Sequence, residues 1–337
     1  MKTRFLLVTM GDPNGVGPEI CVRLLSRRLE LPTGMVPVIL GDLKVLKQAQ
    51  GVLQSKKTLV EIPSLEDAVS LWPRAIPVFS AGVHFSEKVM PGRVSKAAGA
   101  ASIGWVRLAA ELILAGEASA MVTAPICKES VEMTVPGFQG HTEFIGDLCG
   151  DPQPVLALVH GNWVVAHVST HVSMREACDR VRQERILKVA TLLHQFLRKY
   201  RGLQSPRIGV AGLNPHAGEH GLFGDEELQE ILPAVKTLRK KHINATGPLP
   251  GDVVFPQLRA ERFDGVVAMY HDQGHVVTKS LYFNLGKKPT VGGVNTTLGL
   301  PVLRTSVDHG TGFDIAWKGI ASDLSLRDAL LLAAKRV

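Results

Sequence analysis

The chain has 337 residues, enough for about two domains of roughly 150 residues each. Apolar residues make up 45% and charged residues 20%, which excludes a disordered chain, and no apolar run reaches the roughly 18 residues that cross a bilayer. The net charge is +7, but the basic residues are scattered along the sequence and are not interleaved with aromatic residues. This pattern fits the binding of an anionic small substrate at least as well as the binding of nucleic acid. We expect neither a nucleic-acid partner nor a membrane partner.

Cysteine usage favours a reducing compartment. The four cysteines, Cys21, Cys127, Cys149 and Cys178, show no CxxC spacing and do not form a disulfide framework. The apolar N-terminal stretch is short and lacks a cleavage site, so it predicts a buried first strand and not a secretion signal. We therefore expect a cytoplasmic protein.

Short aliphatic runs alternate with stretches of helical periodicity along the chain. The predicted strands are residues 5–10, 36–40, 76–79, 120–123, 155–159, 163–168, 207–212, 265–270 and 302–305. The predicted helices are residues 18–29, 43–52, 96–115, 185–200, 226–241 and 326–335. Because several strands are almost entirely aliphatic, they predict an α/β protein with a mostly parallel sheet covered by helices. Residues 280–293 are predicted to be an exposed loop.

A glycine-rich turn follows the first predicted strand, at Gly11 to Glu19. Such a strand-to-helix turn exposes backbone N–H groups that can hold an anion, and Pro18 suits the first turn of the helix. The turn lacks the third glycine of a dinucleotide-binding fingerprint and the Gly-Lys-Ser/Thr of a P-loop. A tight turn that needs positive φ is an equally good interpretation.

Three histidines each lie just beyond an aliphatic run: His171, His216 and His271. Ligands gather at the carboxyl edge of open α/β sheets, where these side chains are expected. Three imidazoles with an open coordination position suit a catalytic divalent ion such as Zn²⁺. From spacing alone, however, the interpretation that these are three separate structural histidines is slightly favoured over a metal site. His160 and His167 are better candidates for structural roles than for metal binding.

Other polar segments are individually ambiguous. His271, Asp272 and Lys279 fall within nine residues, so Asp272 can orient an imidazole or accept a proton, although Asp-Gln-Gly also suits a turn. Thr142 suits a helix N-cap better than a substrate contact. Arg304 is expected to end a strand, where it can bind phosphate or carboxylate. His309, Gly310, Thr311 and Asp314 are then expected to lie on a turn that leads into a helix.

Taken together, these motifs resemble the 4-hydroxythreonine-4-phosphate dehydrogenase (PdxA) family over essentially the whole chain. The motifs, in order, are Gly11-Asp-Pro-x-Gly-x-Gly-Pro-Glu, Thr123-Ala-Pro-x-x-Lys-Glu, Gly140-His-Thr-Glu-Phe, Asn214-Pro-His-Ala-Gly-Glu, Gly247-Pro-x-Pro-x-Asp252, Tyr270-His-Asp-Gln-Gly, Gly293-Val-Asn-x-Thr-Leu-Gly-Leu-Pro and Arg304-Thr-Ser-x-Asp-His-Gly-Thr.

The resemblance implies a two-domain fold like that of isocitrate and isopropylmalate dehydrogenases, with an inter-domain cleft and NAD or NADP bound without a Rossmann motif. We expect a nucleotide-side domain at residues 1–125 plus 300–337, and a metal, substrate and dimerisation domain at residues 126–299. A homodimer with shared active sites, a phosphorylated substrate and one divalent ion (Zn, Mg, Mn or Co) are implied as well.

The resemblance also implies roles for individual residues. The metal ligands would be His171, His216 and His271. The substrate contacts would be His141, Thr142, Lys279, Asn295 and Arg304. The nucleotide loop would use His309, Gly310, Thr311 and Asp314, and the candidates for proton transfer are Asp252, Asp272 and Lys279.

The implied reaction is the oxidation of 4-phosphooxy-L-threonine at C3 by NAD⁺, followed by decarboxylation to 3-amino-2-oxopropyl phosphate on the route to pyridoxal phosphate. The metal would favour loss of the hydroxyl proton and polarise the new ketone, and Lys279 and Arg304 would position the phosphate.

This sequence departs from the family pattern at several positions. Residues 282–291 look like an insertion, and Cys127, Gly312 and Trp317 stand where Asn, Ala and Gly are more usual. We expect the segment 280–293 to tune substrate choice. The alternatives are a paralogue that oxidises D-threonate or D-erythronate 4-phosphate, a phosphoacyl transferase that does not oxidise, and a non-catalytic metal-binding module.

Overall fold

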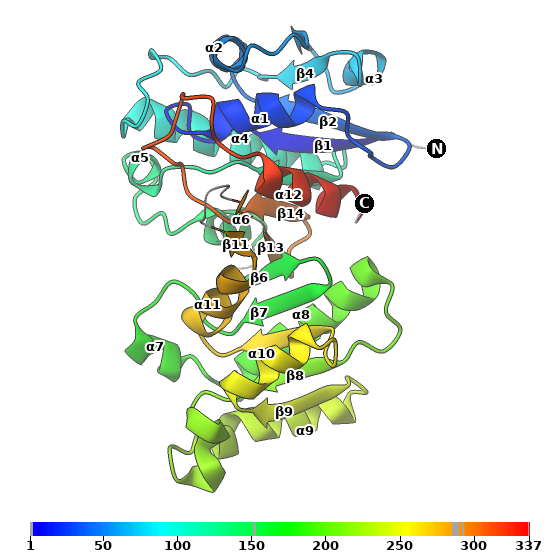
Figure 1. Ribbon diagram of the computed structural model, residues 1–337, viewed down its shortest axis with the longest axis vertical. Coiled ribbons are helices and arrows are strands. Elements are labelled where there is room, and N and C mark those ends of the chain that lie inside the picture. The colour runs from blue at the N-terminus through cyan, green and yellow to red at the C-terminus, as the bar shows by residue number, and fades with distance from the viewer. Residues whose placement is uncertain (1–2, 151–152, 285–289, 292, 336) are drawn as a thin grey trace. The chain divides into compact units, whose positions relative to one another are not determined.

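The computed structural model describes residues 3–150, 153–284, 290–291, 293–335 and 337. It divides into two compact units, which are described separately below (Figure 1). The N-terminal unit comprises residues 1–153, 284–294 and 300–337, and the second unit comprises residues 154–283 and 295–299. The sequence prediction that residues 126–299 form a metal, substrate and dimerisation domain concerns function and stays a prediction.

A parallel sheet forms the centre of the N-terminal unit, with the strand order β3-β4-β2-β1-β5-β14. The strands are β1 (Arg4–Thr9), β2 (Met35–Leu40), β3 (Leu59–Glu61), β4 (Ile76–Phe79), β5 (Ala120–Thr123) and β14 (Arg304–Val307). Five of the six residues of β1 are buried, as the apolar first run predicts, and the strand contacts both α4 and α12.

The helices of this unit are α1 (Gly17–Ser26), α2 (Leu43–Leu53), α3 (Ala68–Leu71), α4 (Lys96–Leu114), α5 (Lys128–Glu132), α6 (His141–Leu148) and α12 (Leu324–Ala334). Side-chain caps fix where two of them begin: Asp42 accepts from Lys44 N at 2.8 Å, and Ser95 accepts from Ala98 N at 3.3 Å. Helix α4 is long and apolar enough to cross a membrane, but half of its apolar window is buried and it packs on β1 and β5. We therefore assign α4 to the core of the unit.

The second unit contains a mixed sheet with the strand order β13-β6-β7-β10-β8-β9. Strands β6 and β7 pair antiparallel, whereas the β7–β10, β10–β8 and β8–β9 pairs are parallel. The strands are β6 (Val155–His160), β7 (Trp163–His167), β8 (Ile208–Ala211), β9 (Ala245–Leu249), β10 (Gly265–Ala268) and β13 (Val294–Leu298). Most strand pairs in the two units are parallel, and the expected α/β class is confirmed.

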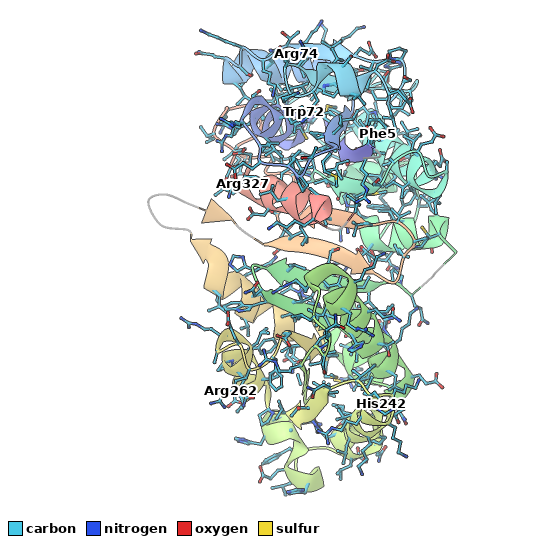
Figure 2. The ribbon with its side chains drawn as sticks, turned by 90° about the vertical axis from the view of Figure 1, so that its right-hand side faces the viewer. Phe5, Trp72, Arg74, His242, Arg262 and Arg327 are labelled. Atoms are coloured by element: carbon cyan, nitrogen blue, oxygen red, sulfur yellow. The ribbon has the colours of Figure 1, made fainter. Side chains whose placement is uncertain are left out.

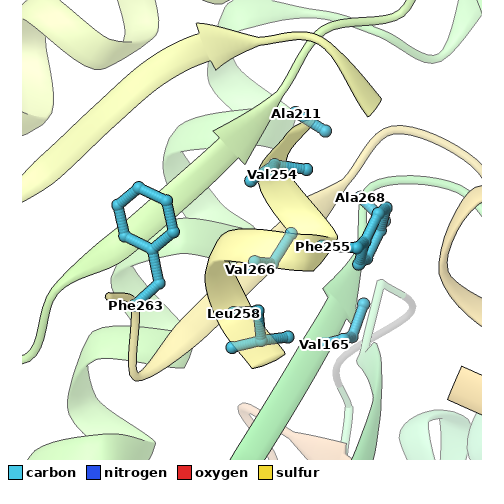
Figure 3. Packing of buried hydrophobic residues seen from close by; sticks show 8 residues of the cluster. All are labelled: Val165, Ala211, Val254, Phe255, Leu258, Phe263, Val266 and Ala268. Carbon is cyan, nitrogen blue, oxygen red and sulfur yellow. The ribbon is translucent and has the colours of Figure 1, made fainter. Parts of the chain in front are cut away.

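The helices of the second unit are α7 (Met174–Asp179), α8 (Gln183–Arg201), α9 (Leu232–Lys240), α10 (Gly251–Arg259) and α11 (His271–Tyr282), with two irregular turns, η1 (Pro215–Gly221) and η2 (Glu227–Ile231). Val254, Phe255 and Leu258 of α10 pack on the strands at Val165, Ala211 and Val266, as Figure 3 shows. This buried contact fixes the helix whose first turn carries Asp252.

The prediction differs from the structure at Arg304 and over residues 226–241. Arg304 begins strand β14, so the prediction that it ends a strand is wrong. The strand continues because its polar residues are bonded inside the unit: Thr305 Oγ1 donates to Ala329 O at 2.9 Å, and Ser306 Oγ donates to Thr123 O at 3.3 Å. The helix predicted over 226–241 is divided into η2 and α9, and Pro233 lies in the first turn of α9.

The segment 280–293 lies partly outside the described residues. Its described part continues α11 and adds two short strands, β11 (Phe283–Asn284) and β12 (Thr290–Val291), which form a small sheet. The prediction of a loop is therefore wrong for these residues. Exposed basic side chains occur on both units, for example Arg74, His242 and Arg262 (Figure 2).

Candidate active site

The second unit carries the three candidate metal ligands just beyond the ends of adjacent parallel strands. His171 follows β7, His271 follows β10 and His216 follows β8, and β10 lies between the other two strands in the sheet. The carboxyl ends of parallel strands meet at one edge of a sheet. Adjacent parallel strands therefore bring ligands from distant parts of the sequence to the same edge.

His271 is held in a defined orientation at the start of α11. Its Nδ1 lies 2.6 Å from Asp272 Oδ1, and its ring centroid lies 5.5 Å from that of His171. A carboxylate that accepts from Nδ1 fixes the tautomer and leaves Nε2 free to bind a metal, as is common around metal-binding histidines. This geometry gives Asp272 an orienting contact with a candidate ligand.

Two further histidines pack behind His271. The ring of His275 stacks on that of His271 with a centroid distance of 3.7 Å and an interplanar angle of 10°, and the ring of His167 lies 4.8 Å from that of His275. Burial, with a smaller contribution from His167, lowers the pKa of His275 to about 2, and burial likewise lowers the pKa of His167 to about 4. Both rings are therefore neutral at physiological pH.

Gln273 ties α11 to the ends of two strands. Its Oε1 accepts from Met269 N at 2.7 Å after β10, and its Nε2 donates to Gly212 O at 2.8 Å after β8. These two bonds fix the start of α11, which carries His271, relative to the chain that leads to His216. The side chain therefore sets the spacing of two candidate ligands that lie 55 residues apart in the sequence (271 − 216 = 55).

A cavity of about 660 Å³ lies at this edge of the second unit. Its polar wall includes Asn214, His216, Asp252, Asp272 and Gln273. Its apolar wall includes Leu213, Phe255, Tyr270, Val276 and Val277. A cavity with apolar walls and a few convergent polar groups is the usual form of a small-molecule site.

The side chains at this edge of the second unit are of the types that bind a divalent ion. In the part of the chain that the structure describes, no group of three or more His, Cys, Asp or Glu side chains is arranged to hold a metal. His171 and His271 are neighbours, however, and His216 lines the same cavity as Asp272, the partner of His271. Neutral imidazoles beside carboxylates are the donors that Zn²⁺ and similar ions prefer.

The N-terminal unit holds a buried cation. Arg304 is 3% exposed, and its guanidinium donates from Nε to Thr123 Oγ1 and from Nη1 to Thr142 Oγ1, both at 3.2 Å. Burial lowers the pKa of Arg304 to about 10, an effect that the nearby Glu143 carboxylate opposes, so the group stays charged at neutral pH. A buried guanidinium with hydroxyls beside it suits a phosphate or a carboxylate.

His141 lies beside Arg304 at the start of α6. Burial, and then the charges of Arg304 and Lys128, lower the pKa of His141 well below its usual value, so the ring is neutral. Its Nε2 is buried and has no hydrogen-bond partner among the described residues, which leaves it available to a ligand. Gly140 occupies the N-cap of α6, so the prediction that Thr142 caps this helix is wrong, and the Thr142 hydroxyl accepts from Arg304 instead.

Lys128 was not predicted as a site residue. A Cβ on Gly140 would lie 4.0 Å from Lys128 Nζ, so the ammonium lies close to the start of α6. The pattern Thr123-Ala-Pro-x-x-Lys-Glu contains this lysine, and its place in a motif is the signal that points to it. Arg304, Lys128 and the two threonine hydroxyls are therefore four groups of the N-terminal unit that favour an anion.

The glycine-rich turn supports the candidate nucleotide loop. Val16 N donates to Thr311 O at 2.9 Å, and a Cβ on Gly15 would lie 3.0 Å from the same oxygen. Gly15 is therefore needed for a close approach between the two loops and not for positive φ, which Gly11 adopts (75°). The buried carboxylate of Glu19 accepts from Trp317 N at 2.7 Å and from Gly319 N at 2.5 Å, which anchors the far end of the loop.

The candidate nucleotide residues follow β14. His309 Nδ1 lies 2.9 Å from Gly310 O, while its Nε2 is buried and unpartnered in the described ranges. A Cβ on Gly310 would meet open space, and Asp314 is exposed. An orphaned imidazole nitrogen, an open glycine and an exposed carboxylate fit a nucleotide. The segment 309–319 is a loop with a turn at 313–317, and the next helix, α12, begins at Leu324, so the prediction of a turn into a helix at this point is wrong.

The remaining candidates belong to the second unit. Lys279 lies on α11, near His275, and Asn295 lies on β13 with its Oδ1 buried and without a hydrogen-bond partner among the residues described. The structure thus groups the candidate residues into two sets. The N-terminal unit holds His141, Thr142, Arg304 and the loop 309–314, and the second unit holds the three histidines, Asp252, Asp272, Lys279 and Asn295.

This fold and these residues define an α/β dehydrogenase of the NAD type. The chain belongs to the PdxA family, because the family described as "Pyridoxal phosphate biosynthetic protein PdxA" matches residues 34–333. The chain is 40% identical to the D-threonate 4-phosphate dehydrogenase of Salmonella typhimurium over 337 residues, which covers 99% of each chain.

Solved structures show the same similarity. The 4-hydroxythreonine-4-phosphate dehydrogenase of Klebsiella pneumoniae is 37% identical with a TM-score of 0.85, and the match covers 99% of this chain and 98% of that one. The enzyme of the same name from Burkholderia phymatum is 36% identical with a TM-score of 0.82, over 100% of this chain and 99% of that one. The expected family is therefore confirmed, and the relatives carry two different substrate names.

Proposed function

We propose that this protein oxidises a 4-phosphorylated sugar acid, D-threonate 4-phosphate, with NAD⁺ and a divalent ion, and that the product then loses CO₂. The observation that carries the proposal is the buried Arg304, which donates to two threonine hydroxyls, because a planar guanidinium with hydroxyl groups beside it suits a phosphate ligand. The 40% identity over 99% of both chains to a D-threonate 4-phosphate dehydrogenase favours the sugar acid over the amino acid.

Different groups of candidate residues would bind the substrate, the metal and the nucleotide. His171, His216 and His271 would hold the divalent ion, and Asp272 would orient His271. The ion would supply Lewis-acid stabilisation of the negative charge that develops on the substrate oxygen. Thr142, Arg304, Lys128 and the neutral His141 would bind the phosphate, with Lys279 and Asn295 as further substrate contacts.

The nucleotide would be held by the loop that follows β14. His309 Nε2 and Asp314 would bind its polar groups, and Gly310 would allow its close approach. NAD⁺ or NADP⁺ would supply the hydride acceptor. The packing of Gly15 and Val16 against Thr311 keeps this loop in place before the nucleotide binds.

The proposed reaction balances without a further reactant. The C3–H bond breaks and its hydride reduces NAD⁺, while the C3 hydroxyl proton leaves to a base, for which Asp252, Asp272 and Lys279 are the candidates. The resulting 3-oxo acid breaks its C1–C2 bond and releases CO₂, and C2 takes up a proton. The product is a three-carbon hydroxyketone phosphate together with NADH.

The solved relatives named 4-hydroxythreonine-4-phosphate dehydrogenase favour a second candidate substrate, 4-phosphooxy-L-threonine. The two substrates share the C3 hydroxyl, the C1 carboxylate and the phosphate, and differ in whether C2 carries a hydroxyl or an amine. The same residues can therefore perform the same chemistry on both, so substrate choice needs a direct comparison.

The test is NADH formation with D-threonate 4-phosphate, D-erythronate 4-phosphate and 4-phosphooxy-L-threonine, each assayed with Zn²⁺, Mg²⁺ and Mn²⁺. We expect the highest kcat/KM with D-threonate 4-phosphate and no turnover after chelation. A preference for the amino acid would replace the proposed substrate with the second candidate. Absence of NADH with every substrate and metal would contradict the oxidation itself.

A further inference from the structure

We propose that Glu227 is a positioning residue that holds His216 at the cavity of the second unit. Glu227 lies at the start of η2 and is only 2% exposed, yet no motif in the sequence singles it out. The inference rests on the proposed function, in which His216 is a metal ligand. It adds a residue that does not line the cavity and acts through the backbone of the loop between β8 and His216.

The carboxylate of Glu227 accepts hydrogen bonds from the backbone that precedes His216. Oε1 accepts from Leu213 N at 2.7 Å and from Asn214 N at 2.8 Å, and Oε2 accepts from Asn214 Nδ2 at 2.8 Å. A carboxylate that accepts three N–H groups fixes them more strongly than neutral acceptors do. Because two of the three are backbone groups, these bonds fix the path of the chain itself.

The backbone immediately after these contacts is strained. Residues 216–220 have φ values of 54°, 54°, 79°, 43° and 57°, and four of these five residues, including His216, are not glycine. A non-glycine residue in this region is costly, and consecutive ones persist only where surrounding contacts determine the conformation. The strain begins at the candidate ligand, two residues after Asn214, whose backbone N–H Glu227 binds.

Glycines in the loop leave room for the Glu227 carboxylate. A Cβ on Gly218 would lie 2.7 Å from Oε2, and a Cβ on Gly212 would lie 3.1 Å from Oε1. The loop therefore wraps closely around the carboxylate on both sides of His216. Ala217 N also donates to Asn214 O at 3.1 Å, which links the strained turn back to a residue that Glu227 holds.

Glu227→Gln tests the contact with little change in size. The amide oxygen can still accept from the two backbone N–H groups, but the amide nitrogen would face the Asn214 side-chain donor, so one contact becomes repulsive. Glu226→Gln is the matched control, because Glu226 is the adjacent carboxylate and accepts from the Asn214 side chain, at 2.6 Å, and not from the backbone at Leu213 or Asn214 among the described residues. His216→Ala reports the effect of removing the ligand itself.

Two measurements on the full-length protein separate positioning from folding. Calorimetric titration of the metal-free protein with Mn²⁺ and with Zn²⁺, without substrate or nucleotide, gives the metal affinity. Amide hydrogen exchange compares residues 213–220 with strand β8, which reports the core. We expect Glu227→Gln to weaken metal binding about 10- to 100-fold and to speed exchange at 213–220 but not in β8, while Glu226→Gln changes either quantity by less than about threefold.

The outcomes distinguish this inference from the proposed function. If His216→Ala loses metal affinity and Glu227→Gln does not, Glu227 positions nothing and the proposed ligand stands. If His216→Ala leaves metal affinity unchanged, the ligand assignment fails and the inference fails with it. Should Glu227→Gln not fold, Asn214→Ala removes one of the three contacts and is expected to weaken metal binding in the same direction, and unchanged affinity in that variant overturns the inference.

Discussion

A single buried charge defines the candidate anion site of the N-terminal unit. Arg304 is charged inside the N-terminal unit, and two threonine hydroxyls accept its hydrogen bonds. A guanidinium presents several N–H donors in a fixed plane, whereas an ammonium presents a compact charge on a flexible stem. The site therefore depends on the shape of the cation as well as on its charge.

Arg304→Lys is expected to lower kcat/KM on the order of 100-fold, because the planar fork that positions the phosphate is lost. Most of the loss should appear in KM, which steady-state NADH assays measure. Arg327→Lys is the matched control, since Arg327 is a partly exposed arginine on α12 that pairs with Asp328 at 3.4 Å. Equal KM values for wild type and Arg304→Lys would refute the phosphate contact.

The three candidate metal ligands can be tested one at a time. Replacing His171, His216 or His271 by alanine should reduce both metal content and turnover, because the two remaining imidazoles hold the ion weakly. NAD⁺ affinity should change far less, since the candidate nucleotide contacts lie at 309–314. Metal analysis and nucleotide titration check this for each variant, with chelated wild type for comparison. Unchanged metal content in all three variants would disprove the assignment.

Asp12 gives a prediction about pH. It is fully buried in the glycine-rich turn, and burial raises its pKa from 3.8 to about 6, although backbone N–H groups of Asn14 and Cys127 oppose the shift. Between these values the folded protein keeps a proton that the unfolded chain has released, so stability falls as pH rises through this window.

Asp12→Asn should remove that dependence. The stability of the variant relative to wild type should therefore increase by about 3 kcal/mol between roughly pH 4 and pH 7. Urea unfolding at a series of pH values measures the difference. Parallel stability curves for the two proteins would show that Asp12 does not titrate in this range.

The sequence predicts the positions of the three candidate metal ligands but not the position of Glu227. His171, His216 and His271 follow aliphatic runs, so strand periodicity alone predicts their place beyond strand ends. Glu227 has no such signal, because its function is to accept hydrogen bonds from a loop that precedes it by 13 and 14 residues. A contact of that kind is set by the three-dimensional path of the chain and not by any local pattern.

Helix α11 depends on a close approach at Gly274. A Cβ at this position would lie 2.2 Å from His167 Nε2, well inside the contact distance. Only glycine therefore lets the helix that carries His271 pack against the end of β7. The glycine of the motif Tyr270-His-Asp-Gln-Gly is required for packing, while its histidine and aspartate are the candidates for chemistry.

Gly274→Ala is expected to destabilise the protein by about 1–3 kcal/mol, because His167 or the helix must move. Gly51→Ala on α2 is the matched control: a Cβ there meets nothing within 4 Å, and alanine favours a helix by up to about 1 kcal/mol. The free energy of unfolding in urea measures both. Equal stability changes of the same sign would show that the close approach at Gly274 costs nothing.

Element prediction succeeded where a short apolar run coincides with a buried strand and failed where polar residues are bonded internally. The strands at 76–79 and 120–123 match their predicted bounds, since their apolar residues coincide with the buried positions. The strand at Arg304 extends instead through Thr305 and Ser306, whose hydroxyls find acceptors inside the unit. Sequence pattern cannot show that such polar residues are satisfied.

The second unit exposes a group of apolar side chains next to the strained turn. Leu222 is 71% exposed, Phe223 is 47% exposed and Leu228 is 46% exposed. The ring of Phe223 lies 6.2 Å from that of His216, so this apolar group adjoins a candidate ligand. Clustered apolar side chains at the surface often mark a contact with another protein.

We predict that the protein is a homodimer that uses this apolar group. The resemblance to the family implies active sites shared between two chains, and an obligate interface is expected to bury more than about 2,000 Å². Leu222→Asp combined with Phe223→Asp should shift the protein to a monomer and abolish turnover, whereas Val69→Asp, at an equally exposed position on α3, should do neither. Sedimentation velocity over a range of concentrations, with NADH assays on the same samples, checks both effects. A wild-type monomer with full activity would end this hypothesis, because the site would then be complete within one chain.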